Sequence, residues 1–153
     1  MSVFEFSLEK IRKLREEQET ETARTLADAR ADADGARQAM EDLESVRDAG
    51  RARILEAHGS GGVIGHLQNL EYVLGCLDEQ IDDAQTTCHA AEEHLVHSIE
   101  EFTEANQRRR TMDHLKARRL EIWQQHQRRV EQADNDEIAI LRHAKGAAAG
   151  FGR

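Results

Sequence analysis

Apolar residues recur at alternating steps of three and four along two long stretches of the chain. Between positions 26 and 57, eight of ten such positions are apolar, where a composition of 39% hydrophobic residues predicts about four. Between positions 67 and 105, eleven of twelve are apolar. This heptad spacing is typical of coiled-coil helices and excludes a disordered chain. We call these positions the seams: Leu26, Ala29, Ala33, Ala36, Met40, Leu43, Arg47, Gly50, Ile54 and Ala57, then Leu67, Leu70, Leu74, Leu77, Ile81, Ala84, Cys88, Ala91, Leu95, Ser98, Phe102 and Ala105.

Glycines separate the two stretches. Gly59, Gly61 and Gly62 can end a helix and let the chain reverse. A short link between long helices favours antiparallel neighbours. We therefore predict an all-α fold, a long antiparallel two-helix coiled-coil hairpin that forms a single domain over residues 1–153. The expected parts are a helix at about 5–57, a glycine-rich turn at 58–62, a helix at about 63–145 and a frayed tail at 146–153.

The second predicted helix is longer than the first. With the turn centred near Ser60, paired residues have numbers that sum to about 121, so positions beyond about 120 form an overhanging C-terminal helix. The overhang carries the apolar residues Ile122, Trp123, Val130, Ile138 and Leu141. Such residues favour a covering surface. Three alternatives remain for what covers the overhang: the N-terminus folding back onto it, a second copy of the chain, or a different protein.

Charge divides the chain into regions. The net charge is −9, which argues against nucleic acid as the main partner. Residues 59–107 contain ten acidic residues and no Lys or Arg, whereas residues 108–153 contain eleven basic and six acidic residues. The hairpin is therefore expected to be acidic toward the turn, its tip, and basic at the opposite end, its root. A basic root suits an acidic socket, although solvated faces of a charged helix give the same pattern.

No motif in the sequence indicates catalysis or a cofactor. The glycines at 59–65 lack the Lys-Ser/Thr of a phosphate-binding loop, and no histidine has the preceding Glu of a di-iron Glu-x-x-His motif. Cys76 and Cys88 are too far apart on one helix to form a disulfide. No apolar run is long enough to span a membrane. We expect no catalytic residue, no metal site and no cofactor.

Both ends of the chain resemble the flagellar export protein FliJ family. The opening Phe4-Glu-Phe6-Ser-Leu8 is similar to the family's Phe-x-Phe-x-Leu pattern, and a basic, apolar turn and an acidic run follow it. The segment Asp134-Asn-Asp136-Glu137-Ile138-Ala139 resembles the family's Asp-Glu-apolar-Ala stretch in a late basic helix. Arg12 departs from the apolar residue often found at its position. The chain length, the single glycine-rich turn and the longer second helix also agree.

The resemblance implies a non-enzymatic stalk protein of the flagellar type III export apparatus. Such a protein inserts into the ring of the hexameric export ATPase and couples it to the membrane export gate protein and to export chaperones. It would be cytoplasmic and peripheral to the inner face of the cell membrane, not inserted in it. The alternatives are a generic coiled-coil scaffold or dimerisation protein, and the equivalent stalk of a type III injectisome.

Carried onto this chain, the resemblance assigns the root to residues of about 4–15 and 108–142. The candidate ATPase-binding residues are Phe4, Phe6, Leu8, Ile11, Leu14, Arg15, Trp123, Asp136 and Glu137. For Leu8, Ile11 and Leu14, packing within the root is the favoured reading. On the tip side, Tyr72 and Val73 lie off the seam and are candidates for contact with the export gate or a chaperone.

Overall fold

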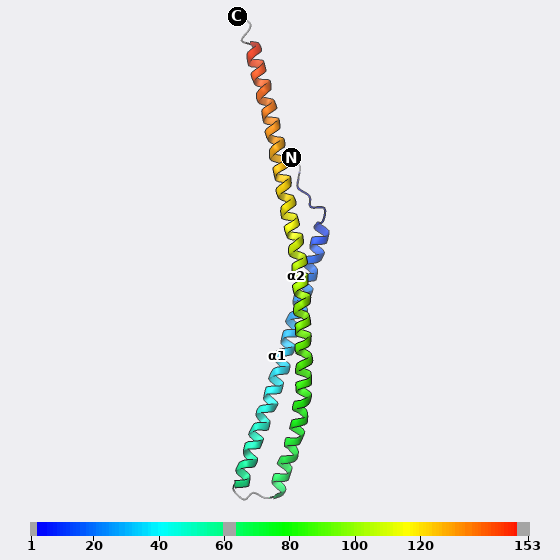
Figure 1. Cartoon of the computed structure of the whole chain (residues 1–153), viewed down its shortest axis with the longest axis vertical. Helices are drawn as coiled ribbons and strands as arrows, with labels where there is room; N and C mark the ends of the chain where they lie inside the picture. The colour runs from blue at the N-terminus through cyan, green and yellow to red at the C-terminus, as the bar shows by residue number, and fades with distance from the viewer. Residues whose placement is uncertain (1–2, 60–63, 150–153) are drawn as a thin grey trace. The chain divides into compact units, whose positions relative to one another are not determined.

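The computed structural model describes residues 3–59 and 64–149, and both of its elements are α-helices (Figure 1). Helix α1 spans Glu9–Gly59, with 51 residues, and α2 spans Ile64–Ala149, with 86 residues. The chain contains no proline, and Ala, Leu, Glu, Gln and Arg dominate both helices, so neither helix is interrupted. The predicted all-α fold of two long helices packed as a hairpin is confirmed.

The observed helix bounds differ from the expected ones at both ends. Helix α1 begins at Glu9, whose backbone N–H donates to the Phe6 carbonyl at 2.9 Å, and residues 3–6 precede it without helical structure. It continues through His58 and Gly59, which the sequence had placed in the turn; residues 60–62 of that turn lie outside the described residues. Helix α2 includes residues 146–149 of the expected tail, and 150–153 lie outside the described residues. Because α2 is continuous, the described residues contain no separate C-terminal helix.

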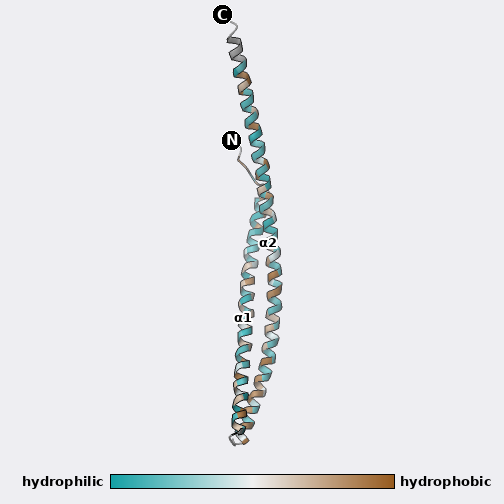
Figure 2. Cartoon of the chain, turned by 60° about the vertical axis from the view of Figure 1, so that its left-hand side comes forward, coloured by the Kyte–Doolittle hydropathy of each residue, from teal (hydrophilic) through white to brown (hydrophobic). Residues whose placement is uncertain are grey.

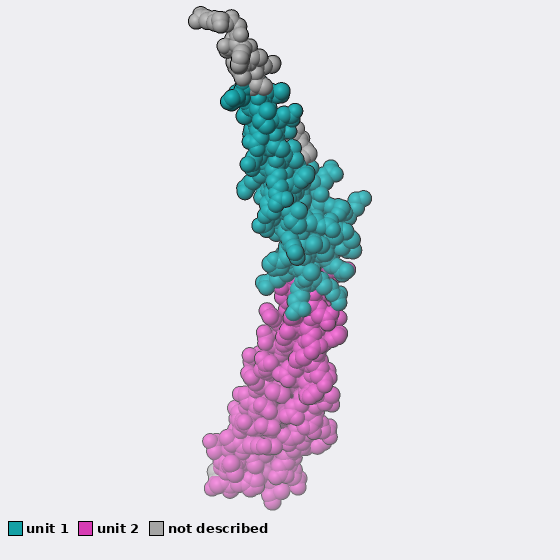
Figure 3. Space-filling view, turned by 45° about the horizontal axis from the view of Figure 1, so that its top comes forward, with its two compact units in different colours: residues 1–16, 107–153 teal, residues 17–106 magenta. Residues whose placement is uncertain are grey.

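The chain divides into two compact units, which Figure 3 colours separately. Unit 1 contains Met1–Glu16 and Gln107–Arg153, and unit 2 contains Glu17–Asn106. Each unit therefore combines a part of α1 with an antiparallel part of α2 (Figure 1). Hydrophobic residues are interspersed among hydrophilic ones along both helices, as expected for helices that bury one narrow face (Figure 2).

The predicted seams form the packed interface of unit 2. All ten seam positions of α1 and all twelve of α2 are buried or half-buried. Burial is deepest where side chains are small, at Ala29, Ala33 and Ser98, which are at most 1% exposed. The Ser98 hydroxyl donates to the His94 carbonyl at 2.9 Å, so its burial leaves no unsatisfied donor. Small side chains let the two backbones approach closely, and the seam positions of both helices are correctly predicted.

The register of the hairpin differs from the predicted one. A Cβ atom on Gly50 would lie 2.8 Å from Leu74 Cδ2, which places these two residues opposite each other. Ion pairs also cross between the helices, among them Arg37 to Glu92 at 3.1 Å and Arg51 to Asp78 at 3.2 Å. The numbers of the paired residues sum to between 124 and 129. The predicted sum of about 121 is wrong. It assumed that the first helix ends near residue 57, whereas α1 continues through Gly59, so each α1 residue pairs with a later residue of α2.

The seam becomes polar on the approach to unit 1. Continuing the same steps from Leu26 toward the N-terminus reaches Thr22 and Glu19 in unit 2 and then Arg15, Arg12 and Leu8 in unit 1, all of them half-buried. Continuing from Ala105 along α2 reaches Arg109, Met112 and Lys116, also half-buried. In the described part of unit 1 only Phe6 is buried, at 8% exposure. Charged side chains therefore occupy positions that apolar side chains fill in unit 2.

Candidate functional site

Aromatic residues from the two ends of the sequence meet in unit 1. The Phe4 ring lies against Trp123, with centroids 5.9 Å apart and planes tilted by 56°. The Arg119 guanidinium lies 5.8 Å from the centre of the Phe6 ring, a cation–π arrangement. Arg119 also donates to Ser7 Oγ at 2.8 Å. The residues before α1 are thus held on α2 through the Phe4 ring against Trp123 and the Phe6 ring against Arg119. Of the predicted root residues, Phe4, Phe6 and Trp123 take part in these contacts.

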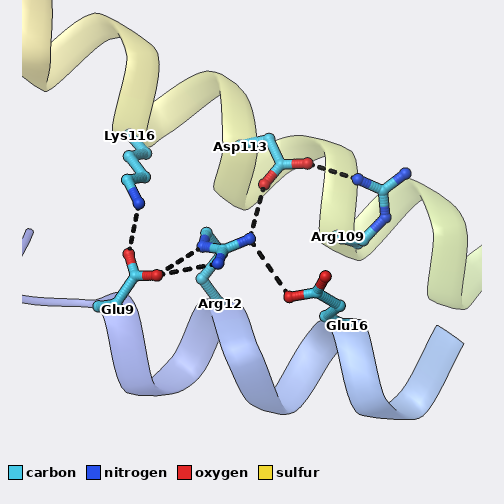
Figure 4. Close-up of polar contacts among 6 residues, drawn as sticks. All are labelled: Glu9, Arg12, Glu16, Arg109, Asp113 and Lys116. Carbon is cyan, nitrogen blue, oxygen red and sulfur yellow. Dashed lines mark hydrogen bonds and ion pairs between the residues drawn. The ribbon is translucent and has the colours of Figure 1, made fainter. Parts of the chain in front are cut away.

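An ionic network continues from this aromatic group along the helix pair (Figure 4). Lys116 Nζ of α2 lies 2.8 Å from Glu9 Oε2 of α1. Arg12 of α1 contacts Glu9 at 2.9 Å and reaches across to Asp113 at 3.6 Å. Asp113 in turn pairs with Arg109 on its own helix. The network alternates acids and bases across the interface, so each charge faces an opposite one.

Glu9 pairs with both Arg12 and Lys116 in this network. The Arg12 hydrogen bond and then the Lys116 hydrogen bond lower the pKa of the Glu9 carboxyl from 4.5 to about 2. Because the pKa is lowered in the fold, ionised Glu9 stabilises the closed network above pH 4.5, and this contribution disappears as the pH falls from 4.5 to about 2.

An NMR titration of the Glu9 side-chain carboxyl is expected to give a midpoint of about 2. Arg12→Leu should raise that midpoint toward 4.5, since the Arg12 hydrogen bond is the largest cause of the shift. Lys116→Met should move it less, because the Lys116 bond is the second cause. A midpoint that does not respond to Arg12→Leu would contradict this assignment.

Ile11 and Leu14 lie on the outer face of α1. They are 43% and 49% exposed, whereas the Arg12 side chain is only 20% exposed. The expectation that Ile11 and Leu14 pack within the root is therefore wrong, because the seam reaches Arg12 and Arg15 and turns these apolar residues outward. Leu8 is half-buried on the seam, as the packing interpretation expects. Ile11 and Leu14 are available to another molecule.

Asp136 and Glu137 lie apart from the aromatic group. They follow Trp123 on α2 by 13 and 14 residues, which corresponds to about 20 Å along a helix. Every residue from 128 to 143 is exposed. The exposed apolar side chains in this segment are Val130, Ile138, Ile140 and Leu141. The structure thus separates the predicted root residues into a group packed around Phe4 and an uncovered segment of α2.

The tip-side candidates lie in unit 2. Tyr72 is 74% exposed and Val73 is 52% exposed. Val73 lines a groove of about 300 Å³ between the helices, together with Val46, Gly50, Leu70, Leu74 and others. Gly50 has no Cβ atom, and Leu74 packs into the space that a Cβ atom there would take. Tyr72 does not line this groove.

Comparison with protein-family models identifies one match, to the family described as "Flagellar FliJ protein", over residues 4–148. The chain belongs to the FliJ family. Searches of curated proteins and of solved structures gave no significant match. The matched region includes all of α1 and all of α2 except its last residue, Ala149.

Membership of the FliJ family makes the chain a non-enzymatic component of the flagellar type III export apparatus. It also favours a flagellar role over one in an injectisome. Neither described helix has a stretch apolar enough to cross a membrane. Over residues 3–59 and 64–149, no three His, Cys, Asp or Glu side chains are grouped so that they could hold a metal ion.

The sequence interpretation did not identify the acidic members of the FliJ-family root. From the sequence, Arg12 is a departure from the family pattern and part of the basic charge, as Lys116 and Arg119 are, whereas Glu9 and Asp113 have no assigned role. The sequence does contain a signal for a charged seam, because steps of three and four taken from Leu26 toward the N-terminus lead to Arg12. A charged seam position requires an opposite charge on the facing helix. Asp113 is where the partner of Arg12 would be sought.

Proposed function

We propose that this FliJ-family chain is a stalk for the hexameric export ATPase. Its root inserts into the ring, and its tip side contacts the membrane export gate protein and export chaperones. The chain acts in the cytoplasm at the inner face of the membrane. The proposal deepens the family assignment, since an export component has to contact the machinery that it serves.

The observation that carries the proposal is an uncovered seam on α2. The steps of three and four that define the α2 seam continue past Trp123 to His126, Val130, Ala133, Glu137 and Ile140, of which Val130, Ala133 and Ile140 are apolar. Phe4 contacts Trp123, so the N-terminal part of the chain covers α2 up to this point. Beyond it Val130 is 42% exposed and Ile140 is 68% exposed. A heptad seam with no facing helix is a binding surface for another protein.

Charge favours an acidic socket for the root. Residues 1–16 and 107–153 contain fifteen Lys or Arg and nine Asp or Glu, in contrast to the strongly acidic remainder. The exposed apolar pair Ile11 and Leu14 lies on the same helix as the exposed bases Lys10 and Lys13. A surface that combines apolar anchors with positive charge matches a pocket of apolar and acidic residues.

The groove beside Val73 supports a contact on the tip side. Apolar side chains and Arg53 of α1 line it, and α2 contains no Lys or Arg before residue 108. An apolar side chain of the gate protein or of a chaperone could enter this groove, with flanking basic residues facing the acids of α2. Gate and chaperone contacts at the tip would leave the root free for the ATPase.

The mechanism we propose is mechanical. A stalk at the axis of a six-fold ring meets six similar surfaces, and it stabilises the ring arrangement that it binds best. The stalk is asymmetric, since α1 and α2 present different side chains, so different nucleotide states of the ring can prefer different orientations. No bond is made or broken on the stalk itself.

The decisive experiment adds the purified chain to its cognate export ATPase. The expected result is a higher rate of ATP hydrolysis together with a larger hexamer fraction, measured by phosphate release and light scattering. Bovine serum albumin at equal mass controls for non-specific stabilisation. If neither quantity changes at saturating chain concentration, the stalk proposal fails. A stable parallel dimer of the chain alone would instead favour the scaffold interpretation.

A further inference from the structure

The first helical turns of α1 face α2 with their charged side. Arg12 occupies a seam position and its side chain is 20% exposed, while Ile11 and Leu14 are 43% and 49% exposed on the outside. A helix that packs stably on another normally presents the opposite arrangement. This segment therefore gains little from apolar burial along its length. We call residues 3–16 the N-terminal arm.

Polar contacts hold the helical part of the arm on α2. Glu9 pairs with Lys116 at 2.8 Å and Arg12 reaches Asp113 at 3.6 Å. The side chains of Glu9 and Lys116 are 32% and 38% exposed, so water and salt reach the pair. Ion pairs this accessible contribute little individually, and dissolved salt weakens them further. Phe6 is the arm's one buried residue.

The adjoining part of α1 is held differently. In unit 2 the seam positions Leu26, Ala29 and Ala33 are at most 6% exposed. Their contacts are apolar, and screening by salt does not weaken apolar contacts. The boundary between the units lies at residues 16 and 17 of α1, between the charged seam positions Arg12 and Arg15 and this apolar run. The two parts of one helix thus differ in how they respond to ionic strength.

We propose that the N-terminal arm is a salt-sensitive clasp that opens and closes over the α2 seam while the helices of unit 2 stay paired. In the closed state the arm contacts the seam positions Lys116, Arg119 and Trp123. In the open state these residues become continuous with the exposed seam at Val130 and Ile140. A helix that binds the exposed seam can then extend along the positions that the arm had covered. The clasp regulates how much of α2 a helical partner can occupy.

Hydrogen exchange on the full chain, followed by mass spectrometry, tests the clasp. Amides of residues 12–16 should be less protected than those of residues 26–40, because local opening is easier where few apolar contacts form. Raising NaCl from about 50 mM to about 500 mM should lower protection in residues 12–16 by about fivefold. Protection in residues 26–40 should fall by less than about twofold. Equal protection, or an equal response to salt in both segments, overturns the proposal.

A matched pair of variants tests the cause. Arg12→Leu places an apolar side chain on the seam, and Lys13→Leu makes the same change on the exposed side of α1. In Arg12→Leu, Glu9 retains Lys116 and Asp113 retains Arg109. Arg12→Leu should raise protection in residues 12–16 at least about threefold and reduce its salt response. Lys13→Leu should leave both as in the wild type, and if the two variants behave alike the clasp is not held through Arg12.

Discussion

Replacing Ile81 by alanine is expected to lower the free energy of unfolding by about 2–4 kcal/mol. Ile81 is 3% exposed and is the most deeply buried large apolar residue of α2 among those described. Ile81 is a seam position of α2. In the register set by Gly50 opposite Leu74, it faces Leu43 of α1. A hairpin of two helices has a single layer of buried side chains. Few neighbours are available to close the cavity, and the loss should be near the upper part of this range.

Chemical denaturation followed by circular dichroism measures this loss. The matched control is Val96→Ala, since Val96 lies on the same helix and is 57% exposed. The control should change the free energy of unfolding by at most about 0.5 kcal/mol. Similar losses in the two variants would show that the seam is not the source of stability, and the heptad interpretation of unit 2 would fail with it.

The seam is the part of the fold that the sequence predicted best. Every seam position that the sequence assigned between 26 and 105 is buried or half-buried, including the non-apolar positions Arg47, Gly50 and Ser98. Heptad spacing succeeds because the geometry of a helix fixes which side chains share a face. The register, which decides which α1 residue faces which α2 residue, was harder to predict because it depends on how far α1 continues into the glycine-rich segment. Gly59 is helical, although its residue type predicts a helix end.

The root shows why site residues were harder to predict than the fold. The aromatic residues Phe4, Phe6 and Trp123 were assigned together through the family resemblance, and two of them do contact each other. The outward orientation of Ile11 and Leu14 was not anticipated, because apolar residues were assumed to point inward. When the seam steps are continued from Leu26 to Arg12, they pass over Ile11 and Leu14 and predict that both point outward. Local residue type misleads where a charged network replaces the apolar core.

The variant Val130→Asp/Ile140→Asp is expected to weaken stimulation of the export ATPase strongly without unfolding the chain. Both residues lie on the uncovered α2 seam, at 42% and 68% exposure, so their replacement should cost the free chain little stability. In a complex the two aspartates would be buried against an apolar and acidic surface, which is costly for an unpaired charge. The chain concentration for half-maximal stimulation should rise more than about tenfold.

A second variant separates this effect from a change in charge alone. Gln132→Asp/Asn135→Asp adds the same two charges to the same exposed segment of α2, on the helix face opposite Val130 and Ile140. This control should stimulate the ATPase within about threefold of the wild type, because its aspartates remain in water. Circular dichroism should show equal helicity in both variants. If the control loses stimulation as completely as Val130→Asp/Ile140→Asp does, net charge and not the apolar seam governs binding to the ring. If neither variant loses it, the ATPase does not bind this segment, because an apolar contact cannot tolerate two buried aspartates.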